Sequence, residues 1–221
     1  MRQRIKLGFG VVVFLGLALN YSWLHAAMVV SSVDNNCRAQ VIDEAAGRVA
    51  DLFGEQTSTP WIRCLDKPHL GLGKVIGTTN FAPGLPAIIL LNQDGHNVDV
   101  IAHEWAHAEL AERIGVLPRT YQIPTWLDEG IAMQVDFRAA YGDGALIKML
   151  EEVKTPILGD IESPSTFYAA GVQGRTHYSW SRCVVAELLK EESLASLIER
   201  ALEGSKLDGH CKPRGAQISP S

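Results

Sequence analysis

Two histidines and a glutamate lie together in the segment His103-Glu104-Trp105-Ala106-His107, which has the pattern HExxH. In an α-helix, residues four apart are offset by only about 40° and rise about 6 Å. Both imidazoles of a helical HExxH segment therefore leave the same face and can reach one metal ion at about 2.0–2.1 Å. Glu104 then lies beside such an ion, where it can take a proton from water. The motif predicts His103 and His107 as metal ligands and Glu104 as a general base.

Two histidines leave such an ion one protein ligand short, because a catalytic zinc usually takes three protein ligands and keeps one position open. The segment WLDEG at residues 126–130 supplies two acids, and Glu129 lies 22 residues after His107. If the helices that carry the two segments pack together, an acid of the second can reach the ion. Glu129 is the predicted third ligand. Asp128 is the competing choice, and it is more simply an acceptor for a ligand imidazole.

The combination of HEWAH and WLDEG resembles the signature of the gluzincin superfamily, the thermolysin-like and aminopeptidase clan of zinc metallopeptidases. The resemblance covers residues 87–136 and is closest to the short, stand-alone peptidase MA-like domains. It implies that His103, His107 and Glu129 hold Zn2+ and that Glu104 is the general base. It also implies that the strand before the HExxH helix, residues 87–92, pairs along its edge with an extended peptide or protein substrate.

The aminopeptidase branch of this family has a tyrosine that opens a late apolar helix and stabilises the oxyanion of the reaction. By that resemblance Tyr178, which precedes the apolar run 183–189, is a candidate for this role. His177 and Tyr168 are rival candidates. The family's G-x-M-E-N motif, which captures a substrate amino terminus, is missing from the sequence, and residues 84–87 lie near its place. The expected activity is therefore that of an endopeptidase rather than an aminopeptidase.

The elements that must position these residues follow from apolar spacing and from capping residues. A helix is expected over residues 97–114, ended by Gly115, and the apolar run at residues 87–91 predicts a strand before it. Pro124 favours the start of a second helix over residues 125–137. Further helices are expected over residues 35–53 (capped by Asp34), 144–153, 176–190 and 193–203, further strands over 61–65 and 73–78, and a loop over 155–164.

This order of one helix, a few strands and then helices indicates an α+β fold. With the resemblance, we expect a small zincin-like domain with a short mixed or antiparallel sheet and an active-site helix, followed by a helical C-terminal part. The length of 221 residues predicts one domain, the metallopeptidase domain at residues 31–204. Residues 205–221 are rich in proline, glycine and polar residues, so we expect a loose C-terminal tail unless Cys211 is tied down.

Residues 1–30 have the pattern of an export segment. Three basic residues and no acid precede an apolar run at residues 7–19. That run is short for a bilayer span, which needs about 20 apolar residues. Residues 25–27 (His-Ala-Ala) include small residues but offer no clear A-x-A cleavage site. A cleaved signal peptide and an uncleaved anchor, tethering the protein through residues 7–30, are both open. In either case the chain from Ser31 on is exported to the periplasm or another extracytoplasmic space.

Four cysteines follow the export segment, and an even number in an exported chain predicts two disulfides. The pairs Cys37–Cys64 and Cys183–Cys211 are favoured because each is local in the sequence. Cysteine zinc sites are disfavoured, because the sequence has no C-x-x-C spacing.

The charge balance excludes one class of partner. The net charge is −5, and without the three basic residues of the export segment it is −8, from 17 basic and 25 acidic residues. Nucleic-acid binding needs a basic face, so it is not expected. The alternative to an enzyme is an exported metal-binding or interaction protein that keeps the fold without turnover, although metal affinity alone does not require Glu104. The sequence makes no prediction of oligomeric state.

Overall fold

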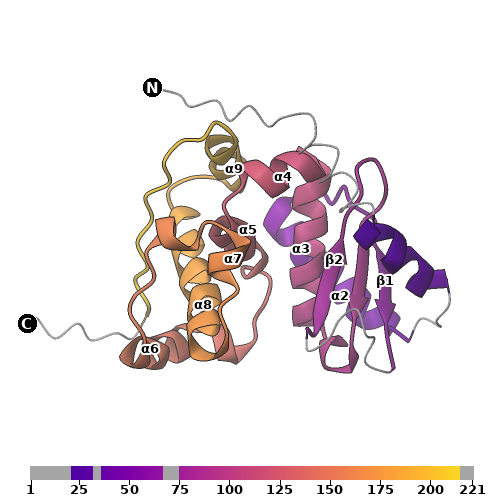
Figure 1. The fold of residues 1–221 in the computed structure, drawn as a ribbon, viewed down its shortest axis with the longest axis horizontal. Coiled ribbons are helices and arrows are strands. Elements are labelled where there is room, and N and C mark those ends of the chain that lie inside the picture. The colour runs from indigo at the N-terminus through magenta and orange to yellow at the C-terminus, as the bar shows by residue number, and fades with distance from the viewer. Residues whose placement is uncertain (1–20, 32–35, 67–74, 215–221) are drawn as a thin grey trace, which may run out of the picture.

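The computed structural model describes residues 21–31, 36–66 and 75–214. The apolar run at 7–19, the expected cap Asp34, the start of the strand expected at 73–78 and the end of the C-terminal tail lie outside these residues. A small sheet forms one end of the molecule and a group of helices the other, with α3 (Val98–Ile114) between them (Figure 1). The expected α+β fold, with a helical C-terminal part, is confirmed.

The sheet has three strands, β1 (Trp61–Cys64), β2 (Gly77–Asn80) and β3 (Ile88–Leu91), in the order β1-β3-β2. The pairing is mixed, since β3 is parallel to β1 and antiparallel to β2. β3 therefore lies in the middle of the sheet, and its backbone is paired on both sides. This corrects the expectation that residues 87–92 bind substrate along an edge, because the described edge strands are β1 and β2.

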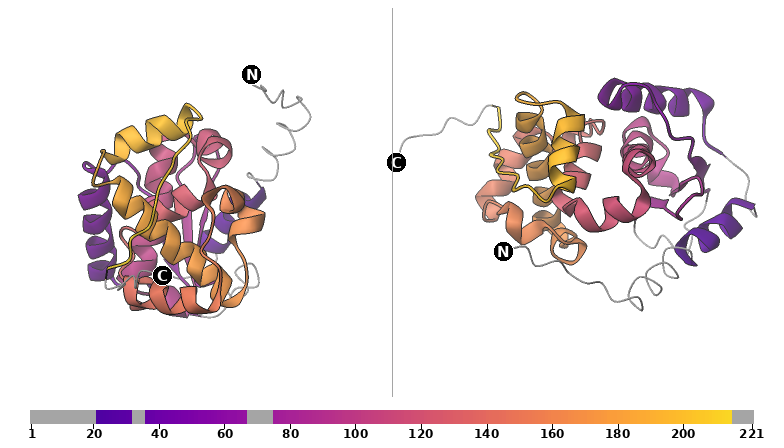
Figure 2. Two further views of the ribbon diagram at one scale, coloured as in Figure 1. Left: turned by 90° about the vertical axis from the view of Figure 1, so that its left-hand side faces the viewer. Right: turned by 90° about the horizontal axis from the view of Figure 1, so that it is seen from above.

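The two faces of β3 pack against different layers. Ile89 and Leu91 belong to a core shared with α3 and with α2 (Ala39–Phe53). α2 ends at Gly54 as predicted, but it begins four residues later than predicted, with Arg38 in place of Asp34 at its N-cap. Ile88 and Leu90 instead contact the helix of residues 21–31, where Ala26 and Val29 are buried. The sheet thus lies between this first helix and the α2 and α3 layer (Figure 2). Residues expected to belong to the export segment form one layer of the fold.

α3 has the boundaries that its capping residues predict. The Asn97 side chain accepts a hydrogen bond from the Val100 amide at 3.0 Å, and Gly115 ends the helix with φ at 87°. Every residue from 101 to 111 is buried except Glu104, which is partly exposed. The connection to the next helix contains α4 (Val116–Gln122), which was not expected from the sequence.

The C-terminal part is helical, as expected, with shifted boundaries. α5 (Thr125–Ala132) is five residues shorter than predicted, and α8 (Gly171–Leu188) begins five residues earlier. A 3-10 helix at Leu158–Ile161 interrupts the expected loop at 155–164, and the short α7 (Pro164–Phe167) begins at the last residue of that loop. The other α-helices of this part are α6 (Asp143–Glu152) and α9 (Leu194–Leu202). Helices α5, α8 and α9 enclose a second core that includes Trp126, Val185 and Leu197.

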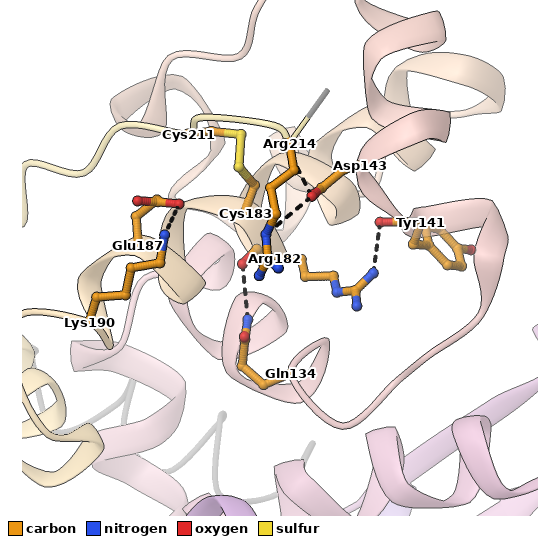
Figure 3. Close-up of a disulfide and its surroundings, with 9 residues drawn as sticks. All are labelled: Gln134, Tyr141, Asp143, Arg182, Cys183, Glu187, Lys190, Cys211 and Arg214. Carbon is orange, nitrogen blue, oxygen red and sulfur yellow. Dashed lines mark hydrogen bonds and ion pairs between the residues drawn. A yellow bond between two sulfur atoms is a disulfide. The ribbon is translucent and has the colours of Figure 1, made fainter. Parts of the chain in front are cut away.

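Both predicted disulfides are present. Cys37–Cys64 joins the segment before α2 to β1, and Cys183–Cys211 joins α8 to the C-terminal segment (Figure 3). Leu207 packs into the second core, so the described part of this segment is held against the helices. In the described ranges, no helix is long and apolar enough to cross a membrane.

Candidate functional site

The three predicted ligands converge between α3 and α5. One ligand atom from each of His103, His107 and Glu129 lies within 4.8 Å of the others. Glu129 Oε2 is 3.2 Å from His103 Nε2 and 3.5 Å from His107 Nε2. All three residues are buried, with exposed fractions of 3–6%. Two imidazole nitrogens and a carboxylate oxygen therefore face a single point from two helices.

The glycine of the WLDEG segment explains how α5 takes its place. A Cβ atom at Gly130 would lie 2.6 Å from Val185 Cγ2 and 2.8 Å from the Ser181 carbonyl oxygen, so only glycine allows α5 to pack this closely on α8. Neighbouring residues of a helix point about 100° apart. With Gly130 facing α8, Glu129 is turned towards α3 and its histidines.

The group fits a cation. Glu129 Oε2 is buried and has no hydrogen-bond partner within the described chain, although both Nε2 atoms are near it. A buried carboxylate oxygen without a partner is costly, and a metal ion shared with the two imidazoles removes that cost. Two nitrogen ligands and one oxygen ligand also match the protein ligand set of many catalytic zinc sites.

The electrostatics of the group also favour positive charge. Burial alone lowers the pKa of His107, but the Asp128 and Glu129 carboxylates outweigh this and raise the pKa to about 10. Burial alone raises the pKa of Glu129, but His107 and His103 outweigh this and hold it well below its usual range. The site therefore stabilises a carboxylate and a positive charge side by side, which is the charge pattern of a bound cation.

Asp128 holds His107 in place. Its Oδ1 accepts a hydrogen bond from His107 Nδ1 at 2.9 Å, which leaves Nε2 for the metal position. Arg119 from α4 forms an ion pair with Asp128 at 2.5 Å. Burial raises the pKa of Asp128, but Arg119 and His107 lower it below its usual value. Asp128 is therefore an acceptor for the ligand imidazole, which is the simpler of the two roles that the sequence left open.

His103 has a second carboxylate behind it, which was not predicted from the sequence. Asp136 is fully buried, and its Oδ2 lies 3.6 Å from His103 Nδ1. Arg138 binds both oxygens of Asp136 through its guanidinium group. Asp99, which lies one turn before His103 on α3, pairs with Arg48 instead. The only sequence signal for Asp136 was an acid two residues before an arginine, which is too common to single out.

Glu104 is held by the edge strand β2. The Thr79 hydroxyl donates a hydrogen bond to Glu104 Oε2 at 2.7 Å, and a Cβ atom at Gly77 would lie 3.0 Å from Oε1. Thr79 therefore fixes one oxygen of the carboxylate, and Gly77 leaves space beside the other. Neither residue could be singled out from the sequence, because β2 precedes Glu104 by about 25 positions and nothing in it marks a partner for the motif.

The outer edge of β2 runs past Glu104. The backbone N–H of Asn92 donates to the Ile76 carbonyl oxygen at 3.0 Å, so Ile76 and Asn92 are a hydrogen-bonded pair of the β2–β3 ladder. Hydrogen-bonded and non-hydrogen-bonded pairs alternate along an antiparallel ladder, so the backbone N–H and C=O groups of Gly77 and Thr79 point away from β3. In the described part of the chain, no strand pairs with that edge.

Of the oxyanion candidates, the structure brings the two tyrosines to the metal group and not His177. The Tyr178 ring lies 6.2 Å from the His103 ring, and the Tyr168 hydroxyl donates to Glu129 Oε1 at 2.5 Å. Burial and the Glu129 carboxylate raise the pKa of both phenols, so both keep their protons at neutral pH. His177 Nδ1 instead donates to the Phe167 carbonyl oxygen at 2.7 Å.

Residues 97–164 match a protein family described as "Protein of unknown function (DUF1570)". The matched range begins at the cap of α3 and contains His103, Glu104, His107 and Glu129, but neither β2 nor α8. It covers less than a third of the chain, so the similarity concerns the metal-site segment. No curated protein and no solved structure matches the chain.

Proposed function

We propose that the protein is an exported zinc-dependent endopeptidase. The observation that carries the proposal is the convergence of His103, His107 and Glu129, while Glu104, the next residue after His103, is outside the ligand set and is held by Thr79. The two disulfides are consistent with a location outside the cytoplasm.

His103 Nε2, His107 Nε2 and Glu129 Oε2 are the atoms that would hold the ion, and imidazole and carboxylate ligands together suit zinc. When bound, zinc supplies a Lewis acid that polarises a carbonyl oxygen and lowers the pKa of water. His107 keeps its orientation through Asp128. Glu129 keeps its orientation through Tyr168, which donates to the other carboxylate oxygen.

Glu104 moves the proton in the proposed reaction. Its Oε1, the oxygen that Thr79 does not bind, accepts a proton from the attacking water, and the carboxyl group then gives this proton to the leaving amine. Water adds to the peptide carbonyl carbon, the C–N bond breaks, and the products are a carboxylic acid and an amine. Tyr178 keeps its phenol proton and donates a hydrogen bond to the oxyanion that develops on the carbonyl.

The edge of β2 supports a peptide substrate. Backbone groups of Gly77 and Thr79 can pair with an extended peptide, which binds through its main chain whatever its side chains are. An internal segment of a protein chain can lie there as well as a free end. Together with the missing amino-terminus motif, this favours an endopeptidase.

The test is Glu104→Gln in the full-length protein, compared with Glu151→Gln on the exposed surface of α6. We expect both variants to bind zinc as the wild type does. Glu104→Gln should hydrolyse fluorescein-labelled casein about 10²–10⁴-fold more slowly, because it loses the general base. A chelator should abolish wild-type hydrolysis, and added zinc should restore it. Unchanged activity in Glu104→Gln would remove the mechanism, and a zinc-bound wild type that cuts no peptide of a broad library would favour a metal-binding protein without turnover.

A further inference from the structure

A cleft of about 560 Å³ opens one helical turn beyond His107 along α3. Ala108 and Ala111 form its floor, and the loop of residues 81–87 between β2 and β3 forms one wall. The start of α4 forms the other wall. Since Ala111 follows His107 by four residues, it lies on the same face of α3 as the two histidines.

We propose that this cleft is a specificity subsite that binds an apolar side chain of the peptide substrate. The proposal rests on the proposed function, because the peptide is held along β2 and cut beside Glu104. Beyond the proposed function, it names the class of substrate residue that the enzyme selects and the part of the protein that selects this residue.

The cleft continues from the edge of β2. Phe81, which lines the cleft, follows Thr79 by two residues, a distance of about 7 Å along an extended chain. Thr79 is the residue that holds Glu104. In a peptide paired with β2, a side chain about two residues from the cleaved bond therefore reaches the mouth of the cleft.

The wall of the cleft is also linked to the metal group. The Arg119 guanidinium lies 4.5 Å from the centre of the Phe81 ring, and the same arginine pairs with Asp128. Asp128 in turn holds His107. Phe81, which lines the cleft, is thus connected to the metal ligands by successive contacts through Arg119 and Asp128.

The chemistry of the lining selects an apolar side chain. Leu85 and Leu117 stand on opposite rims with exposed fractions of 46% and 41%, and the floor consists of alanine methyl groups. Glu112 is the only charged residue among the described lining residues, and it is exposed. The Ser58 hydroxyl is already bonded to Glu109 at 2.7 Å. A leucine-sized side chain covers this apolar surface. An acidic side chain would lose its hydration beside Glu112, and a basic one would gain only a solvent-exposed ion pair with Glu112, which contributes little.

Binding is tested first, without turnover. The full-length Glu104→Gln protein, loaded with zinc, is titrated into two fluorescein-labelled nonapeptides of alanine and serine that differ only at the central residue, leucine or serine. We expect the leucine peptide to bind about tenfold more tightly. Adding Ala111→Leu, which fills the cleft, should reduce this preference to about twofold or less. Leu117→Ala, an exposed truncation at the rim, should reduce it about threefold.

The matched control is Ala145→Leu on α6, which makes the same change on a helix that does not line the cleft, and it should keep the tenfold preference. Equal affinities for the two peptides overturn the proposal, as does a leucine preference that survives both Ala111→Leu and Leu117→Ala.

Cleavage by the wild-type protein separates this proposal from the proposed function. We expect cuts at a fixed distance from the leucine, and we expect that fixed distance to be lost in Ala111→Leu. A leucine preference in binding with no cleavage by the wild type would overturn the endopeptidase assignment and keep the subsite. If the cleavage position depends neither on the leucine nor on the Ala111→Leu substitution, the subsite proposal is overturned and the endopeptidase assignment stands.

Discussion

At the scale of single residues, the candidate site depends on side chains that lie outside the HExxH motif. Asp128 orients His107 and is itself paired with Arg119, and Thr79 holds one oxygen of Glu104. Asp128 and Arg119 therefore support the metal ligands, whereas Thr79 supports the proposed base. Substitutions can therefore separate metal affinity from turnover.

Asp128→Asn tests the support of the metal ligands. The amide has no charge to stabilise the imidazole, so we expect zinc affinity to fall about 10- to 100-fold. Competition with a chromophoric chelator measures this directly and does not depend on any activity. Asp51→Asn, at an exposed position of α2, should leave the affinity unchanged. If Asp128→Asn binds zinc as tightly as the wild type does, Asp128 has no part in holding His107.

Thr79→Val tests the support of Glu104. Valine keeps the shape of the side chain but cannot donate to the carboxylate, so Glu104 loses its fixed orientation. We expect kcat to fall about 10- to 100-fold, with KM and zinc content unchanged. Thr79→Ser should restore most of the rate. Thr78→Val, whose side chain leaves the opposite face of β2, is the matched control. A fall in zinc content together with the rate would point to a structural fault instead.

At the scale of elements, the site is defined by the edge strand β2 and by the approach of α5 to α3. β3 stands directly before the HExxH helix in the sequence, yet it lies in the middle of the sheet. β2 takes the edge because β3 pairs with both of its neighbours. α5 reaches α3 with its acid because Gly130 lets the other side of α5 pack closely on α8.

Gly130→Ala tests that packing. The added methyl group meets Val185 and the Ser181 backbone, so α5 must shift away from α8. We expect the free energy of unfolding to fall by about 1–3 kcal/mol and zinc affinity to fall with it, because Glu129 moves with the helix. Gly144→Ala on α6, where a Cβ atom meets no atom within 4 Å, should be neutral or slightly stabilising. Urea unfolding of the two variants gives the comparison, and equal stability would contradict the packing argument.

At the scale of the whole molecule, the sheet is a middle layer whose two faces are covered from distant parts of the chain. α2 and α3 cover one face, and the helix of residues 21–31 covers the other. The Trp23 indole donates to the Pro86 carbonyl oxygen at 2.8 Å, so this first helix also holds the loop that forms a wall of the cleft. Cleavage within residues 25–27 would remove part of this layer.

A truncation tests whether this layer belongs to the stable fold. A chain that begins at Tyr21 keeps the helix, and a chain that begins at Ser32 leaves Ile88 and Leu90 uncovered. We expect the shorter chain to lose on the order of 3 kcal/mol of unfolding free energy and to aggregate, because apolar side chains return to water. Thermal unfolding and light scattering of the two proteins measure this. Equal stability and solubility would show that the sheet does not need the helix.

Features that depend on neighbours along the chain could be predicted before the fold was known. Helical spacing placed His103 and His107 on one face of α3. The capping residues Asn97 and Gly115 predicted the ends of this helix. Nearness in sequence favoured the correct disulfide pairs. Caps and periodicity act over a few residues, so they can be recognised without the fold.

The other features of the site follow from the three-dimensional fold. It put β2 at the edge of the sheet and Tyr178 beside the histidines, and it brought Thr79 and Asp136 to the motif. These relations depend on which elements pair and pack, and the free energy of such contacts comes from burial between segments far apart in sequence. Local sequence patterns do not specify which distant elements pair, so these relations cannot be predicted from neighbouring residues.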